Sequence, residues 1–221
     1  MREKPAPRSR RFVRGAIAAL IGAGVVAGIG ASGMFGVAVE HPAFKSVVTD
    51  GAFEIRDYPA LVVAEVTVPG GQKQAASRGF RLLAGYIFGA NRTRQTIAMT
   101  APVAQAPAHE TIAMTAPVSQ TQAAGQWVVR FTMPHRYTLE TLPRPDNPQV
   151  RVQQTPPQRF AVIRFSGVAS PDRVATQTTA LEQWLKTRAL VPTGPATLAQ
   201  YDPPWTLWFM RHNEVMIPVA P

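Results

Sequence analysis

The chain has 221 residues and a formal net charge of +10, with 46% hydrophobic residues, 16% charged residues and no cysteine. This length and composition fit one globular domain with its own core plus a short appendage. The absence of cysteine excludes disulfide bonds, thiol catalysis and metal sites built from thiolates.

Residues 1–39 have the composition of an export signal or a membrane anchor. The opening "MREKPAPRSRRFVRG" carries six basic residues and a single acid, and no charged residue follows from Ala16 to Val39. A basic end before an apolar stretch is typical of a signal peptide, and "SRRFVR" partly resembles a twin-arginine signal. The apolar stretch is also long enough to span a bilayer, so cleavage and retention as an anchor both stay open. In either case we expect the globular part, residues 40–221, on the periplasmic or extracellular side of the inner membrane.

Nucleic acid is not an expected partner. The basic residues beyond Val39 are scattered, and the sequence has no zinc-finger spacing, no phosphate-binding glycine loop and no basic stripe interleaved with aromatic residues. The basic residues before Ala16 adjoin an apolar run, which favours a membrane or export role for them over a nucleic-acid-binding arm.

The first half of the expected domain alternates strands with one helix. Phe53–Val68 has the period of two of a pair of strands, which Tyr58-Pro59-Ala60 interrupts. Gln74–Phe88 has the helical period, and Gly89 is its candidate C-cap. The predicted buried stripe of this helix is Ala76, Phe80, Leu83 and Ile87. Three further strands are expected at residues 97–103, 112–118 and 127–133.

The second half repeats this order. "VRVQQTPPQRFAVIRFSG" has the pattern strand, proline break, strand, and a helix then begins with Ser170 as N-cap and Pro171 in the first position. The segments "ATLAQY", "TLWFMR" and "EVMIPV" complete the half, and the turn-rich Leu142–Pro148 joins the two halves. We therefore predict an α+β fold in which two β-β-α-β-β units pair about a pseudo-twofold axis, giving a curved, partly closed sheet with two flanking helices.

The phrase "TIAMTAPV" occurs twice, at residues 96–103 and 111–118, with "AQAPAHE" between the copies. Strand alternation places Met99 in the first copy and Met114 in the second on one face of each strand, and small residues on the other. Methionine is a flexible and polarisable filler. Two interpretations stay open: core packing after a local duplication, or a pocket wall of thioethers and methyl groups suited to a flat apolar ligand.

Several blocks of the chain, in order, resemble the SOUL haem-binding protein family. They are "FEIRDYPALVVAEV", "GFRLLAGYIFGANR", the two "IAMTAPV" segments, "WVVRFTMP" and "YDPPWTLWFMRHNEV". The resemblance covers about Glu40 to Val219 and implies a distorted antiparallel β-barrel of two similar halves with two helices. It also implies a non-enzymatic protein that binds haem or a related porphyrin non-covalently, as a carrier, scavenger or buffer.

The resemblance further implies a binding surface beside the first helix. The residues carried over to it are Phe80, Leu83, Ala84 and Ile87, together with the loop Tyr201 to Trp205. Cations for the haem propionates would come from Arg78 and Arg81, or from Arg92 and Arg94. Asp57 stands where a relative has a histidine proposed as axial ligand, and Ser77 and Gly85 stand where relatives have basic residues.

The sequence does not single out one residue as the iron ligand. Met99 and Met114 are candidate thioether ligands, since haem proteins do use methionine. The four histidines, none spaced like a metal pair, are further candidates: His41, His109, His135 and His212.

The sequence favours a binding protein over an enzyme. The sequence shows neither a nucleophile with a neighbouring base nor a pair of carboxylates placed for catalysis. Glu54 and Arg56 share one strand face, where we expect them to pair across solvent. A second hypothesis is an effector-sensing or protein-interaction module that binds other amphipathic ligands, and a third is haem-modifying chemistry.

Overall fold

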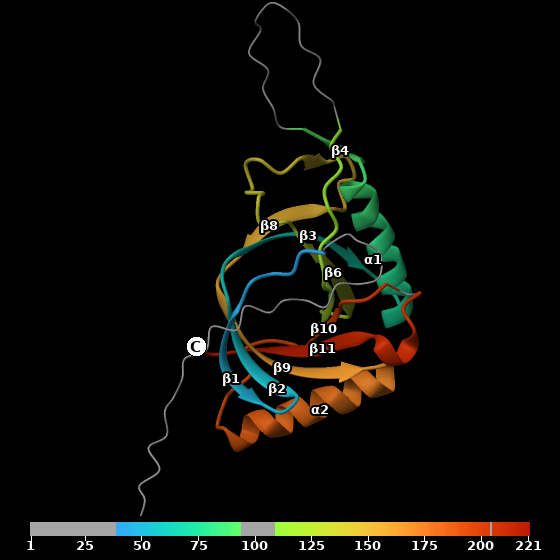
Figure 1. Cartoon of the computed structure of the whole chain (residues 1–221). Coiled ribbons are helices and arrows are strands. Elements are labelled where there is room, and N and C mark those ends of the chain that lie inside the picture. Colours follow the sequence, from blue (N-terminus) through green and yellow to red (C-terminus); the bar gives the residue numbers. More distant parts are fainter. Residues whose placement is uncertain (1–38, 94–108, 204) are drawn as a thin grey trace, which may run out of the picture.

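A computed structural model describes residues 39–93, 109–203 and 205–221 (Figure 1). The predicted leader, apart from its last residue, lies outside the described residues, as do Arg94, Met99 and the first copy of the doubled phrase. Of the helices in the described ranges, none combines the length and the hydropathy that crossing a bilayer requires.

One antiparallel sheet of nine strands curls into a half-barrel (Figure 1). The strand order is β1-β2-β9-β11-β10-β5-β6-β3-β8. Its strands are β1 (Lys45–Asp50), β2 (Phe53–Tyr58), β3 (Leu61–Val68), β5 (Val118–Ala123), β6 (Gln126–Thr132), β8 (Arg151–Thr155), β9 (Gln158–Ser166), β10 (Thr197–Gln200) and β11 (His212–Val219). Two short strands, β4 (Asn91–Arg92) and β7 (Arg144–Pro145), pair separately.

Two helices cover the outside of the half-barrel. Helix α1 (Gln72–Ile87) packs on β3 and β6, and helix α2 (Pro171–Thr187) packs on β9 and β11. The Ser170 hydroxyl accepts a hydrogen bond from the backbone N–H of Arg173, and Pro171 opens α2, which confirms the predicted start. Gly89 follows α1 at φ +120°, a conformation that favours glycine, so the predicted end is confirmed as well.

The buried face of α1 differs in part from the predicted stripe. Leu83 and Ile87 are buried as expected, but Ala75 and Gly79 replace Ala76 and Phe80 in the interface, and Phe80 is 38% exposed. The reason is a close approach: a Cβ on Gly79 would lie 2.6 Å from the Val129 side chain of β6. Glycine lets the helix sit directly on the sheet, and this turns Phe80 toward the rim.

Each helix covers its own apolar cluster. Leu83 and Tyr86 of α1 pack with Phe131, and Leu181 and Trp184 of α2 pack with the second half of the sheet. Since successive residues of a strand point to opposite faces, Ile55 and Ala161 face α2 while their neighbours face the inside of the half-barrel. A smaller inner cluster is formed by Val162, Ala199 and Met216 with Tyr58, Phe160 and Tyr201.

The two halves of the chain exchange strands in the sheet. β2 of the first half pairs with β9 of the second, and β8 of the second half pairs with β3 of the first. The sequence predicts two units side by side but not this exchange. The pseudo-twofold relation between the halves stays a prediction.

One predicted strand is wrong, and one strand was missed. The predicted strand at residues 112–118 is an irregular segment with one bridge, from Thr115 to Glu40, and β5 begins only at Val118. The segment "TLWFMR" contains a 3-10 turn, Trp208–Met210. The sequence does not predict strand β1. Its side chains are almost all exposed, and its sequence lacks a clear alternation of apolar and polar residues.

Candidate functional site

A cavity of about 330 Å³ lies inside the half-barrel, and we call it the inner cavity. Its walls come from both halves of the sheet and include Tyr58, Phe160 and Met216 as apolar surface. A group of charged side chains is buried among them. Arg56 donates two hydrogen bonds to the Glu214 carboxylate, each 2.9 Å long, and a third of 2.7 Å to Glu54.

The charges of the inner cavity satisfy one another. Tyr201 donates its hydroxyl to Glu214 at 2.6 Å, the Nε2 of His212 lies 3.2 Å from the same carboxylate, and Arg164 pairs with Glu54. Within the described residues, no buried side-chain nitrogen or oxygen lacks a hydrogen-bond partner. Glu54 and Arg56 therefore pair as predicted, but in the interior and not across solvent.

These contacts move the pKa values of the inner cavity strongly. Burial alone raises the pKa of Glu214, but hydrogen bonds from His212 and Arg56, together with the Arg56 charge, lower it to about 2. Burial raises the pKa of Tyr58 to about 12, with the neighbouring Arg56 opposing the shift. Burial also raises the pKa of Tyr201, and the Glu214 charge adds to the effect. At neutral pH the site thus holds a fixed carboxylate, a fixed guanidinium and two neutral tyrosines, and none of these is poised to transfer a proton.

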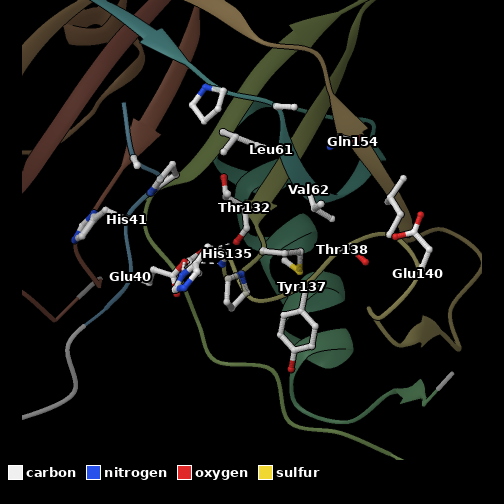
Figure 2. Close-up of a pocket in the computed structure, with 18 residues that line it drawn as sticks. Glu40, His41, Leu61, Val62, Thr132, His135, Tyr137, Thr138, Glu140 and Gln154 are labelled. Carbon is white, nitrogen blue, oxygen red and sulfur yellow. Dashed lines mark hydrogen bonds and ion pairs between the residues drawn. The ribbon is translucent and has the colours of Figure 1, made fainter. Parts of the chain in front are cut away.

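A second cavity of about 530 Å³ opens beside the start of β3, and we call it the outer cavity (Figure 2). Leu61, Val62 and Met133 give it apolar walls, and Tyr137 lies on the side nearer α1. This volume falls in the range of roughly 300–1,000 Å³ that is usual for small-molecule sites.

His135 and Glu40 lie together at one side of the outer cavity (Figure 2). The His135 Nδ1 is 2.9 Å from a Glu40 carboxylate oxygen, and the backbone N–H of His135 donates to the same oxygen at 2.7 Å. A carboxylate at Nδ1 stabilises the tautomer in which Nδ1 carries the proton and Nε2 has a free lone pair. No hydrogen bond among the described residues involves this Nε2, and the side chain is 88% exposed.

The second copy of the doubled phrase holds Glu40 in position. The Glu40 carbonyl accepts a hydrogen bond of 3.0 Å from the Ala116 backbone N–H, and Glu40 forms a parallel bridge with Thr115. The Thr115 hydroxyl donates in turn to the backbone of Thr132, at the end of β6. Thr115 lines the outer cavity, whereas the expected pocket residue Met114 is not among the lining residues of either cavity and is 37% exposed.

The residues predicted beside α1 divide into two groups. Leu83 and Ile87 are buried in the core beneath the helix. Phe80, Arg78 and Arg81 are exposed, and Ala84 is half-buried. The apolar stripe at the surface of α1 is therefore Phe80, the half-buried Ala84 and the C-cap residue Phe88, which is 60% exposed; the sequence predicts Phe88 as the helix end and not as part of the site.

The remaining candidate ligands have other surroundings. The His109 Nδ1 contacts the Asn91 carbonyl at 2.5 Å, and Arg92 pairs with Asp146 on the surface. His41 stacks on Tyr201 with ring centres 5.6 Å apart. Asp57 accepts two hydrogen bonds from Arg159, at 2.6 and 2.9 Å. Asp57 thus has a cation partner of its own on the neighbouring strand.

Sequence reasoning considered His135 alone and missed its partner. Glu40 and His135 are 95 positions apart, and Arg56 and Glu214 are 158 apart. No local spacing signals such pairs. The hint in the sequence is that His135 follows the strand predicted at residues 127–133, after Pro134, and binding residues are frequent in the loops that follow strands.

Known structures of the same fold have little sequence in common with the chain. The C-terminal domain of EcmrR is 12% identical and superposes with a TM-score of 0.51, covering 76% of this chain and 96% of that one. A structure described as a hydrolase from Listeria innocua is 14% identical with a TM-score of 0.50, covering 79% and 94%. These similarities show the fold alone. A search of curated proteins finds no significant match.

The family profile described as SOUL heme-binding protein matches residues 39–218. This range contains every strand and helix of the half-barrel except the last residue of β11. It also contains the full set of residues that line the two cavities. The chain belongs to the SOUL haem-binding protein family.

Proposed function

We propose that this protein binds haem or a related porphyrin in the outer cavity, with the Nε2 of His135 as the iron ligand. It acts as a non-enzymatic carrier, scavenger or buffer, and its globular domain lies on the periplasmic or extracellular side of the inner membrane. Membership of a haem-binding family supports the ligand class. The His135–Glu40 pair is the observation that carries the choice of site.

The residues of the outer cavity fit a porphyrin in three respects. The walls around Leu61, Val62 and Met133 present apolar surface to a flat macrocycle. The pair supplies an imidazole nitrogen in the correct tautomer, and a carboxylate behind an imidazole raises its basicity as a metal ligand. His41, also on the wall of this cavity, supplies a further polar group. Bound haem supplies an iron centre and a strong Soret band, and the latter is the readout.

The site differs from the one that the family resemblance implies, beside α1. That surface offers Phe80, Ala84 and Phe88 as an apolar stripe with Arg81 nearby, but the two cavities described above lie away from it. It contains no histidine within the helix. The stripe offers one apolar face without an imidazole, whereas the outer cavity combines apolar walls with the His135–Glu40 pair, and we therefore favour the outer cavity.

Titration of the full-length protein with hemin tests the proposal. We expect a saturable Soret shift at equal stoichiometry, and for His135→Ala a loss of affinity of about tenfold or more together with an altered ferric spectrum. His109→Ala is the matched control, since His109 also has one ring nitrogen engaged by an oxygen. Its titration should match that of the parent protein.

Two outcomes would contradict the proposal. The absence of any saturable shift would count against haem as the ligand. Saturable binding that survives His135→Ala but is lost in Phe80→Asp would place the haem on the exposed stripe of α1. Phe80 is at the rim of the core, so its variant also needs an unchanged unfolding midpoint.

The alternative function is an effector-sensing module. The inner cavity favours it, because Tyr58, Phe160 and Met216 offer aromatic and thioether surface to an amphipathic ligand. A thermal-shift screen distinguishes the two functions: stabilisation by apolar compounds but not by hemin, abolished by Ser119→Trp in the wall of the inner cavity, would support the alternative. Ser119 lines this cavity and not the outer one.

A further inference from the structure

The loop between β10 and β11 exposes five large apolar side chains in a short stretch, and we call them the aromatic loop: Trp205, Leu207, Trp208, Phe209 and Met210. Their exposed fractions lie between 55% and 80%, and the 3-10 turn within the loop has no buried residue. Soluble proteins seldom expose contiguous apolar surface of this kind without a partner.

The exposure is part of a defined backbone conformation. The Met210 N–H donates to the Leu207 carbonyl at 2.9 Å, and the Thr206 N–H donates to the Pro203 carbonyl at 3.0 Å. The Arg211 guanidinium closes the loop by donating from Nε to the Thr206 carbonyl at 2.9 Å. These contacts pair part of the loop's backbone within the loop, and paired backbone groups are what a low-dielectric environment requires.

The composition of the aromatic loop matches a membrane interface. Tryptophan is enriched where the acyl chains meet the headgroups, because its ring is apolar and its N–H is polar. No acidic residue occurs from Trp205 to Arg211, and the loop ends on a cation. Trp205 and Trp208 therefore suit a lipid surface better than a polar protein surface.

The base of the aromatic loop also lies against the segment through which the chain enters the domain. His41 stacks on Tyr201 at 5.6 Å, and Tyr201, just after β10, stacks on His212, the first residue of β11, at 4.3 Å. The uncharged run from Ala16 to Val39 ends two residues before His41. A bilayer that holds this run is thus brought close to the base of the loop.

We propose that the aromatic loop inserts into the interface of the bilayer that the N-terminal segment enters, and so fixes the orientation of the half-barrel on the membrane. The insertion uses Trp205 and Trp208 as interfacial anchors and Leu207, Phe209 and Met210 as the deeper apolar contacts. It does not depend on haem binding, because it requires no residue that lines the outer cavity.

Tryptophan quenching in the full-length protein tests this. The chain has four tryptophans, and the two outside the loop, Trp127 and Trp184, pack against the two clusters beneath the helices. With vesicles of phosphatidylcholine and phosphatidylglycerol whose acyl chains are brominated, we expect a blue shift and the loss of about half of the emission. In the double variant Trp205→Phe, Trp208→Phe the bromine-dependent loss should largely disappear.

A second variant separates insertion from mere proximity. Leu207→Asp with Phe209→Asp keeps both loop tryptophans but should abolish their quenching, since charges are expelled from the bilayer. The matched control, Val191→Asp, replaces another apolar residue that is 68% exposed and should leave the quenching intact. Both variants should keep the parent unfolding midpoint, because the replaced side chains are exposed.

Two results would overturn the insertion. One is an emission spectrum unaffected by brominated vesicles. The other is quenching that persists unchanged in the double variant Trp205→Phe, Trp208→Phe, which would trace the signal to Trp127 or Trp184. In the first case the oligomeric state gives the alternative. If the parent protein sediments as an oligomer and the double variant Leu207→Asp, Phe209→Asp sediments as a monomer, the loop is a contact between copies of the chain and not a lipid anchor.

Discussion

Two histidine–glutamate pairs lie in the two cavities, and they differ in what else the glutamate binds. Glu214, in the inner cavity, is buried and accepts hydrogen bonds from Arg56 and Tyr201 as well as lying near His212. Glu40, in the outer cavity, is partly exposed, and its carboxylate contacts only His135 among the hydrogen bonds described. The same two residue types therefore serve a structural charge cluster in one place and an orienting contact in the other.

The two pairs leave their histidines in different surroundings. In the inner cavity the carboxylate is neutralised by Arg56, and the His212 nitrogen that faces it is engaged. At the outer cavity, no hydrogen bond among the described residues involves the His135 Nε2, and the side chain is 88% exposed. Removing a partner should therefore affect stability in the first case and ligand binding in the second.

The largest effect is expected from Arg56→Met. This change leaves Glu54 and Glu214 buried without their shared cation, and breaking a buried pair in this way costs about 3–5 kcal/mol of unfolding free energy. Urea denaturation measures it. The control is Arg159→Met, which removes a similar bidentate pair with Asp57, at a partly exposed position where β2 pairs with β9. Equal losses in the two variants would contradict a special role for the inner cluster.

Acid should destabilise the protein through Glu214. Its pKa is about 2 in the folded state, below its ordinary value of 4.5, so the folded protein holds this proton less tightly than the unfolded chain. The stabilisation is fully present above pH 4.5 and is lost as pH falls from about 4.5 to 2, and it amounts to about 3 kcal/mol. Unfolding free energies measured over this range for the parent and Glu214→Gln should converge at the acid end.

Tyr201→Phe should have a smaller effect on the same cluster. It removes one hydrogen bond to a buried carboxylate, which costs about 1.5–3 kcal/mol. Thermal or urea unfolding measures the loss. The comparison with the outer cavity is Glu40→Gln, whose side chain still accepts from the His135 backbone and is partly exposed, and it should leave the unfolding midpoint near that of the parent.

The smallest effect in free energy is expected for ligand binding in Glu40→Ala. Loss of the oxygen at Nδ1 leaves the His135 tautomer and ring orientation undefined, which should weaken hemin binding by about tenfold. Hemin titration of this variant beside His212→Ala sharpens the comparison. We expect the second variant to keep the parent affinity, and the reverse result would assign the iron to the inner cavity.

Much of the fold was accessible from the sequence, because helix ends and strand periods are local. Ser170 and Gly89 mark the helix boundaries through their own backbone preferences, and both predictions are confirmed. The predicted buried stripe of α1 is wrong at Phe80, because the orientation of the helix depends on the close approach of Gly79 to Val129 of β6, far along the chain. The predicted strand at residues 112–118 failed for a similar reason: Thr115 and Ala116 bond to Glu40 and not to a neighbouring strand along their length.

The family and its ligand class were likewise legible in the sequence blocks, whereas the arrangement of the site was not. The family resemblance implies that Leu83 and Ile87 belong to the binding surface beside α1. In the structure they lie beneath the helix, because packing fixes which side of an amphipathic helix meets the sheet. The assignment of ligand contacts to Phe80, Arg78 and Arg81 stays a prediction.

The sequence by itself determined both helices, one boundary of each helix (Gly89 after α1 and Ser170 before α2), most of the strands of the sheet and membership of the family. These depend on residue types at short spacing. The tertiary structure alone decided that β2 pairs with β9 and β8 with β3, that Arg56 joins Glu54 to Glu214 in the interior, and that Glu40 meets His135. Such contacts join residues far apart in the chain, and only the curl of the sheet brings them within hydrogen-bond distance.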